Sequence, residues 1–365
     1  MTPSLRDSRD AENAERAQLA EALARARQFT AGFDSRESLK AAGQAIRLAR
    51  RLKDPRAEAE ALLLATTSHY QRGDYVSAVA NGIDACATYR VNDLEGRSHA
   101  FSGVALAFFS VRDYKRAEEA ARRAIHYAAR DRESTLEATA RSTLAFALAE
   151  AGRFDEALAE LARARRSYRK AGDTVRMKKS SSNTGHTLRK QGHAQLAARE
   201  TEAARRSWRR AARWYGVALG IGQSRLDDAI IQGAWAECLL MLERVPESLK
   251  RVMAAQALQQ PGDPKPIVAS LALWRAECER ALENWTAAER LLKEAIDEAD
   301  AIDNDEVSVD ARVAMGRLCE ARGDTLRGRQ WRAEAKRVAE AQVASFAEFR
   351  RQMRPLWDRF LRTED

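Results

Sequence analysis

The stretch RRSWRRAARWYG, residues 205 to 216, concentrates the side chains that could do chemistry. Guanidinium groups bind phosphates and carboxylates, and aromatic rings stack on nucleic-acid bases. At about 100° per residue of helix, however, the arginines lie on one edge and the aromatic residues on the opposite edge. This separation disfavours base stacking and predicts an amphipathic helix with an exposed basic edge and a packed aromatic edge. The two sets are Arg206, Arg209, Arg210 and Arg213 against Trp208, Ala211, Ala212, Tyr215 and Leu219.

The positive charge is concentrated around this stretch. The net charge is +9, but residues 163–213 hold 16 Arg or Lys and only 3 acids, so the rest of the chain is slightly acidic. The 51 Arg against 11 Lys also resemble the bias of a GC-rich genome. The distribution of charge, more than its total, therefore indicates where a phosphate backbone or an acidic protein surface would dock.

Signatures of catalysis are missing from the sequence. GxxxxGK[ST], HExxH, GxSxG and CxxC do not occur, and the glycines of GVALGIG follow no strand that would make them a phosphate-binding loop. Cys86, Cys238, Cys278 and Cys319 stand singly in helical segments, which predicts buried, reduced thiols. We therefore expect no enzyme activity, no cofactor and no metal site.

The chain as a whole is expected to be an all-α protein. It has 365 residues with 45% hydrophobic content, and nearly every stretch follows helical periodicity, without the alternation typical of strands. The first residues lack the pattern of a signal peptide, and no uncharged apolar run reaches the roughly 18 residues of a membrane span. These features predict a soluble cytoplasmic protein.

An internal repeat of about forty residues organises the sequence. The same small residues recur at its eighth, twentieth and twenty-seventh positions, as in Ala105, Ala117 and Ala124. Small residues let two helices approach closely, so each repeat is expected to be an antiparallel helix pair. Asp or Asn residues before the pairs are expected to cap the helices that follow. The copies begin at Leu19, Ala59, Ser98, Ala138, Lys178, Ile230, Ala269 and Val309, and the turns are expected at Gly73, Gly152, Gly192 and Gly323.

The sixth copy departs from this pattern. Counted from Ile230, its three diagnostic positions hold Glu237, Leu249 and Gln256, and it begins 52 residues after its predecessor. The extra residues are expected to form a helical extension around 205–230.

These repeats resemble the tetratricopeptide family, in the long form common in bacterial regulatory proteins. The resemblance covers residues 19–348 and implies a right-handed α-solenoid of about eight helix pairs with a C-terminal capping helix. Residues 1–18 would be a polar segment leading into the first helix, and residues 349–365 a terminal helix or tail.

The resemblance also implies that the first helix of each pair lines a concave groove. At the positions facing it, the fifth copy is polar and basic, and the fourth contributes a hydroxyl and a ring, which would suit a peptide with an acidic segment. The alternative is a solvated face with no fixed ligand. The carboxylate clamp of chaperone-binding relatives is not expected, because Ser102 and Thr143 replace its asparagines. The candidate groove residues are Lys179, Ser182, Asn183, His186, Arg189, Lys190, Ser142 and Phe146.

The end of the chain reads as a further helix, broken by Pro355. Its apolar residues are expected to cap the solenoid, or alternatively to dock a partner or form a homodimer. The residues named for docking are Phe349, Leu356, Trp357 and Phe360.

The function predicted from the sequence is that of an adaptor or regulatory scaffold that binds a protein or peptide, with an acidic segment, in its groove. Two alternatives stay open. One is a nucleic-acid-associated protein that uses the basic 163–213 region on phosphates; the other is a module that senses a small peptide.

Overall fold

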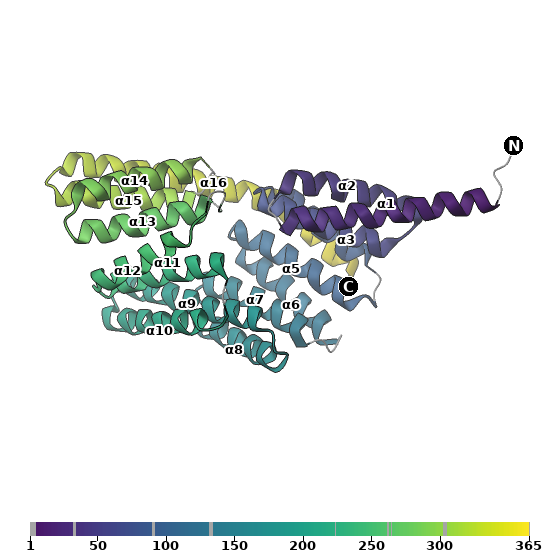
Figure 1. The fold of residues 1–365 in the computed structure, drawn as a ribbon, viewed down its shortest axis with the longest axis horizontal. Coiled ribbons are helices and arrows are strands. Elements are labelled where there is room, and N and C mark those ends of the chain that lie inside the picture. Colours follow the sequence, from purple (N-terminus) through teal and green to yellow (C-terminus); the bar gives the residue numbers. More distant parts are fainter. Residues whose placement is uncertain are drawn as a thin grey trace. The chain divides into compact units, whose positions relative to one another are not determined.

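The structure, a computed structural model, describes residues 5–31, 34–89, 92–130, 134–222, 224–260, 263, 265–301 and 305–364. Across these residues there are only helices, turns and loops, and consecutive helices pack in antiparallel pairs as in a helical-repeat solenoid (Figure 1). The all-α prediction and the eight helix pairs are confirmed. The sixteen helices in the described ranges are α1 (Leu5–Ala31), α2 (Ser35–Leu52), α3 (Pro55–Gln71), α4 (Tyr75–Thr88), α5 (Leu94–Ser110), α6 (Tyr114–Arg130), α7 (Ser134–Glu150), α8 (Phe154–Lys170), α9 (Thr174–Ala197), α10 (Thr201–Leu219), α11 (Arg225–Met241), α12 (Val245–Ala257), α13 (Lys265–Ala281), α14 (Trp285–Asp300), α15 (Asp305–Ala321) and α16 (Thr325–Glu364).

Aspartates start many of these helices, as the linker pattern predicts. The side chain of Asp54 accepts a hydrogen bond from the backbone N–H of Ala57, and Pro55 occupies the first turn of α3. Asp93 and Asp173 cap α5 and α9 in the same way. Each such cap stabilises its helix by about 1 kcal/mol. Asp131 and Asp303, which stand in the equivalent linkers, lie outside the described residues.

The turns within the pairs use left-handed backbone. Gly73, Gly152 and Gly323 have φ values of 76°, 78° and 86°, which confirms three of the four predicted turn glycines. Arg112, Glu243 and Glu283 take the left-handed conformation in the corresponding turns of other pairs. A side chain in this conformation costs roughly 1–2 kcal/mol.

The prediction that Gly192 ends a helix is wrong. Helix α9 continues to Ala197, and Arg199, with a φ of 65°, makes the turn instead. Gly192 serves packing, because a Cβ at this position would overlap the indole of Trp208 on α10. The extension therefore lies largely in α9, and the small residues that pack α10 are Ala204 and Ala211, both fully buried.

The predicted register of the sixth repeat is also wrong, by one residue. In the other pairs from α3 to α15, the predicted repeat start lies four residues after the first residue of the first helix. Helix α11 begins at Arg225, so the sixth repeat starts at Ala229. The diagnostic positions then hold Ala236, Ser248 and Ala255, all small and fully buried. Ser248 donates a hydrogen bond to the carbonyl of Ala236 at 2.7 Å. This repeat is regular, and Glu237 moves to a groove-facing position.

The chain divides into two compact units. Unit 1 comprises residues 1–167 and 346–365, and unit 2 comprises residues 168–345. The largest apolar cluster of unit 1 combines residues of α3 to α8 with the end of α16. In unit 2, one apolar cluster is built mainly from α13, α14 and α15.

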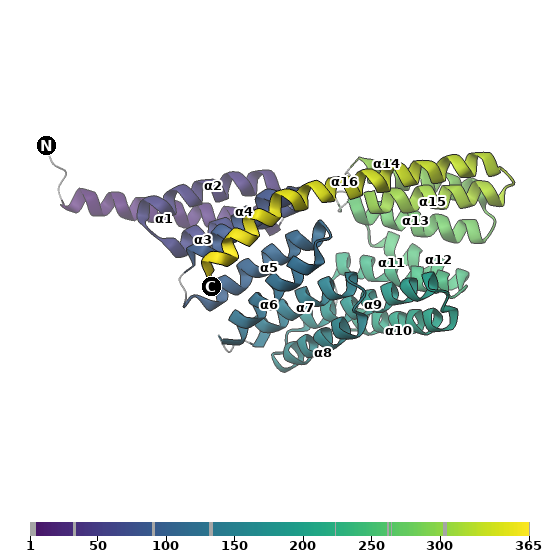
Figure 2. The same cartoon turned by 180° about the vertical axis from the view of Figure 1, so that it is seen from behind.

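Helix α16 contributes to both units, and the prediction that Pro355 breaks it is wrong. An internal proline costs a helix roughly 3 kcal/mol. On either side of Pro355, however, Met353 and Trp357 are fully buried and Phe360 nearly so. Burial of three such side chains contributes more than the proline costs, at roughly 1.5–3 kcal/mol each. Within unit 1, the end of α16 crosses α4 and reaches α5 (Figure 2).

Candidate binding groove

The charged residues of the candidate groove of unit 2 lie on α9, α11 and α15, each the first helix of its pair. Asp310 on α15 is surrounded by protein and by the charges of Glu306 and Glu237, which raise the pKa of its carboxyl above the ordinary value although solvent reaches the side chain. Arg189 on α9 acts on the same carboxyl in the opposite direction. Charges on α9, α11 and α15 thus act on one another, and we take the surface that these helices carry as the candidate groove.

An ion-pair network joins α9 to α11 at the centre of this groove. Nη1 of Arg189 lies 2.5 Å from Oε2 of Glu237, and Nε2 of His193 lies 2.8 Å from Oε1 of the same carboxylate. Burial alone would raise the pKa of Glu237, but the Arg189 charge and the bonds to His193 outweigh it and lower the pKa to about 2. Glu237 is therefore a carboxylate at neutral pH, and it balances the positive charge of Arg189.

His186 borders this network as a neutral side chain. Burial and the nearby charges of Arg189 and Lys190 lower its pKa to about 3. Nη2 of Arg189 lies 3.3 Å from Nδ1 of His186, which as an unprotonated nitrogen can accept a hydrogen bond from it. His186 can thus offer a peptide a polar, uncharged ring.

The other predicted residues of α9 flank this centre. Ser182, Asn183 and Lys190 are half-buried, whereas Lys179 is exposed. The structure therefore keeps the six α9 residues together on one helix, but it neutralises part of their charge. A polar and basic groove wall was expected, and Glu237 adds an acidic group to it.

Ser142 and Phe146 belong to unit 1, on α7. Ser142 donates a hydrogen bond to the carbonyl of Ala138 at 3.0 Å, and the ring of Phe146 lies 6.0 Å from that of Phe109. Both side chains have partners within unit 1, so we treat the α9 to α15 surface as a candidate site by itself.

Two groups in unit 2 were missed by the sequence analysis. Glu237 was assigned to the wrong face by the one-residue register error. Lys178 is buried, and its ammonium lies 2.5 Å from Asp228 and donates to the carbonyl of Gly222 at 2.8 Å. This lysine joins α9 to the first turn of α11 and to the segment before it.

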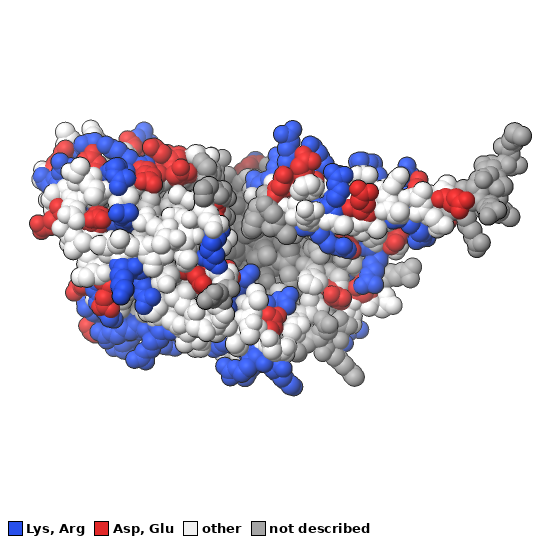
Figure 3. Space-filling view, viewed as in Figure 1, with Lys and Arg blue, Asp and Glu red and all other residues white. Residues whose placement is uncertain are grey.

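The basic edge of α10 is exposed, as predicted. Arg206, Arg209, Arg210 and Arg213 reach solvent, and in the described part of the chain none of the four forms an ion pair. Trp208 and Tyr215 are buried, which confirms that the aromatic edge is core. Lys and Arg gather along the lower edge of the surface over α10 (Figure 3).

The C-terminal docking residues are packed within their own chain. Trp357 lies between Phe101 and Phe108, with ring centroids 6.1 Å and 5.6 Å away, and donates from Nε1 to Glu119 at 3.0 Å. Phe349 contacts Tyr75, Phe360 is nearly buried, and Leu356 is half-buried. The expected docking surface is therefore covered by α5 and its neighbours. A partner could reach these residues only by displacing the end of α16 from α5.

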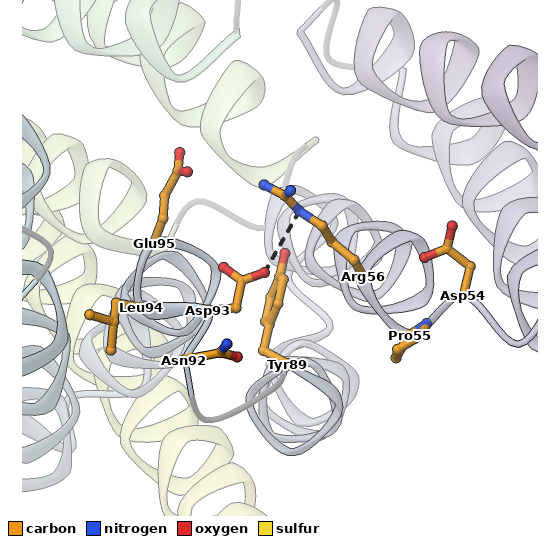
Figure 4. A pocket seen from close by; sticks show the side chains of 8 residues that line it. All are labelled: Asp54, Pro55, Arg56, Tyr89, Asn92, Asp93, Leu94 and Glu95. Atoms are coloured by element: carbon orange, nitrogen blue, oxygen red, sulfur yellow. Dashed lines mark ion pairs between the residues drawn. The ribbon is translucent and has the colours of Figure 1, made fainter.

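A hollow of about 430 Å³ lies in unit 1 where α3 and α5 begin (Figure 4). Its carboxylates already have structural tasks, because Asp54 and Asp93 cap these helices and Arg56 lies 3.7 Å from Asp93. The Tyr89 ring fills the space left by Gly96. Two of the three acids that line this hollow thus serve helix capping, and the third, Glu95, lies 4.0 Å from His99.

The four cysteines are buried and form no disulfide with one another, as predicted. Within the described ranges, no three His, Cys, Asp or Glu side chains lie together as a metal ion would require. Nor does any helix described here have the length and apolar character needed to cross a bilayer.

No protein-family model and no curated protein sequence matches this chain. Among solved structures, it is similar to the Rap conjugation gene regulator of plasmid pLS20 in complex with the Phr* peptide, with a TM-score of 0.64 and 12% identity over 91% of this chain and 97% of the other. The apo quorum sensor NprR from B. thuringiensis gives a TM-score of 0.61 at 11% identity over 90% and 88%. A tetratricopeptide repeat protein from Parabacteroides merdae gives 0.51 at 11% over 81% and 99%. The chain therefore has the fold of a tetratricopeptide-type repeat protein.

Proposed function

We propose that this protein is a regulatory adaptor that binds an extended peptide in the groove of unit 2. The observation that supports the proposal is that charged groups on α9, α11 and α15 act on one another, with Arg189 and Glu237 paired at 2.5 Å. Two proteins of similar fold support it, since the Rap regulator was solved with the Phr* peptide and NprR with its cognate peptide NprX.

The groove favours a peptide that carries both signs of charge. Lys179 is exposed and can pair with an acidic residue, while Asp310 faces the same groove and can pair with a basic residue. Between them, His186 and the half-buried amide of Asn183 can exchange hydrogen bonds with an extended backbone. The acidic segment predicted from the sequence is thus proposed for the Lys179 end alone.

The test is to select peptides from a random display library on the purified protein and to measure the affinity of the selected peptides by fluorescence anisotropy. Lys179→Glu should weaken binding of peptides with an acidic residue, and Asp310→Asn should weaken those with a basic residue, each by about tenfold or more, as loss of a charge-assisted bond implies. Arg244→Gln is the control, because this arginine is exposed on the turn before α12 and pairs only locally with Glu247. Selected peptides that bind all variants equally would refute the groove as the binding site.

A second candidate function is binding of a nucleic-acid backbone by α10. It is favoured by the four exposed arginines, which have no ion pair in the described part of the chain. Arg206 and Arg213 are about 10 Å apart along the helix, close to three steps of a strand at 3.4 Å.

This candidate predicts a steep salt dependence. The affinity for duplex DNA should fall with a log–log slope of about −0.9 per phosphate contact, and replacing all four arginines by Gln should remove most of that slope. Peptide binding should survive the same substitutions. A shallow slope, or one unchanged in the variant, would eliminate α10 as a nucleic-acid surface.

A further inference from the structure

A second hollow, of about 630 Å³, lies in unit 1 where the end of α16 passes the turn between α5 and α6. Arginines dominate its lining, and one aspartate accompanies them. The turn supplies Arg112, and α16 supplies Arg350, Arg351, Arg354 and Asp358. Its position is distinct from the groove of unit 2 and from α10.

The acids at this hollow already have partners. Nε of Arg354 donates to Asp113 at 2.9 Å, and Arg116 donates from Nη2 to Asp358 at 3.0 Å. Arg351 pairs with Glu348 one turn earlier on the same helix. These contacts neutralise the acids and leave other guanidinium groups in excess.

The excess charge resides on Arg112 and Arg350. The Arg112 guanidinium lies 5.5 Å from the centre of the Phe346 ring, and Arg350 donates to the carbonyl of Val111 at 3.0 Å. Among the described residues of unit 1, neither has a carboxylate partner. A ring and a carbonyl hold the two groups in place without removing their charge.

The backbone of Arg112 adds an independent observation. Its φ is 57°, in a turn where three other pairs have glycine and three have another residue, Arg199, Glu243 or Glu283. Glycine would adopt this conformation without strain, so an arginine here carries a cost of roughly 1–2 kcal/mol. The contact with Phe346 offsets part of this cost, but it does not use the guanidinium's hydrogen-bond donors.

We propose that this hollow binds a multiply charged oxyanion, either a phosphate group or closely spaced carboxylates, between Arg112 and Arg350. Arginine presents planar pairs of N–H donors that match both chemistries. The bound anion bridges the α5–α6 turn and the end of α16, so it also stabilises the packing of residues 346–360 on unit 1.

The test measures binding by titration calorimetry at constant ionic strength, with pyrophosphate and a tetra-aspartate peptide as separate probes. Arg112→Gly restores the residue that other turns use, so the fold should be kept while affinity falls at least tenfold. Glu283→Gly makes the same change in a left-handed turn of unit 2 and should leave affinity unchanged. Hydrogen exchange of residues 346–360 should slow when the probe binds the natural chain.

The two probes separate the sources of the anion. Binding of pyrophosphate that is lost in Arg112→Gly supports the site with a phosphate ligand, and the same result with the peptide alone supports a carboxylate ligand. Absence of binding by either probe at millimolar concentration overturns the proposal. So does binding that persists in Arg112→Gly, or that is lost instead when Arg209 and Arg213 of α10 are changed to Gln.

Discussion

At the scale of single residues, the stability of unit 2 depends on a few charged side chains that pair with one another where little water reaches them. Arg189 and Glu237 have side chains only 19% and 17% exposed. A pair in such a position stabilises little compared with apolar packing, but removal of one partner leaves the other charge poorly solvated. Hence the network at the centre of the groove holds α9 and α11 in place, and it also fixes the charge that a ligand meets.

Replacing Arg189 by Met should therefore lower the free energy of unfolding by about 3 kcal/mol. The double variant with Glu237→Gln should recover much of that loss, because no charge is then left without a partner. Chemical denaturation of these two variants and of Glu237→Gln alone gives the coupling free energy directly. Arg244→Met, in an exposed pair, should cost under about 1 kcal/mol, and an equal cost at both sites would contradict the argument.

His186 predicts an acid sensitivity. Its pKa of about 3 in the folded chain lies below the ordinary 6.5, so between these values the unfolded chain binds a proton that the folded chain does not. The contribution of the neutral ring to the free energy of unfolding is thus fully present above pH 6.5, and it is lost as the pH falls from 6.5 toward 3. Glu237, with its pKa lowered from 4.5 to about 2, adds a loss of the same sign over that lower window.

His186→Asn should accordingly flatten the stability profile between pH 7 and 5, by roughly 1–2 kcal/mol relative to the natural chain. Urea unfolding at several pH values measures this. The exposed His126, changed to Asn, is the matched control and should follow the natural chain. Parallel profiles for the His186 variant would show that this ring does not govern the acid response.

At the scale of elements, the fold of the helix pairs was predictable and the exceptions were not. Recurring alanines report close helix crossings, which is why α5 and α6 could be paired from sequence. The longer α9 shifted the predicted start of the sixth repeat by one residue. Because one residue turns a helix position by about 100°, Glu237 was predicted in the interior instead of in the groove. Gly192 was ambiguous because a glycine can make a turn or make room, and only the Trp208 ring beside it decides between the two.

Gly192→Ala should then destabilise the protein by about 1–3 kcal/mol, since the added methyl overlaps the Trp208 indole. Gly43→Ala lies mid-helix in α2 with no neighbouring atom closer than 3.8 Å, so it should be neutral or stabilise by up to about 1 kcal/mol. Thermal unfolding of both variants compares them. If the Trp208 indole could move aside and admit the methyl group at no cost, the two substitutions would behave alike.

At the scale of the whole molecule, the end of α16 is the feature that sequence could not place. The spacing of Phe346, Phe349, Met353, Trp357 and Phe360 predicts an apolar helix face, but a helical pattern does not name the surface that covers it. Contacts with Phe101 and Phe108 join positions about 250 residues apart. Periodicity reports local structure only, and these contacts arise from the fold.

Deleting residues 346–365 should expose this apolar surface. Unit 1 is expected to lose about 5 kcal/mol of stability, from the burial of Met353, Trp357 and Phe360, and to bind a hydrophobic dye. A synthetic peptide of residues 346–364 should reverse part of both effects when added in excess. A truncated chain as stable as the full one would show that the segment adds nothing to unit 1.

The position of this segment also has a consequence during synthesis. Glu119 and Trp357, which share a hydrogen bond, are 238 residues apart. At about 5–20 residues per second, the ribosome completes α6 some 10–50 s before it adds Trp357. During that interval the aromatic side chains of α5 lack the residues that cover them, so the nascent chain should be most vulnerable to aggregation, and most dependent on chaperones, until Trp357 has been added.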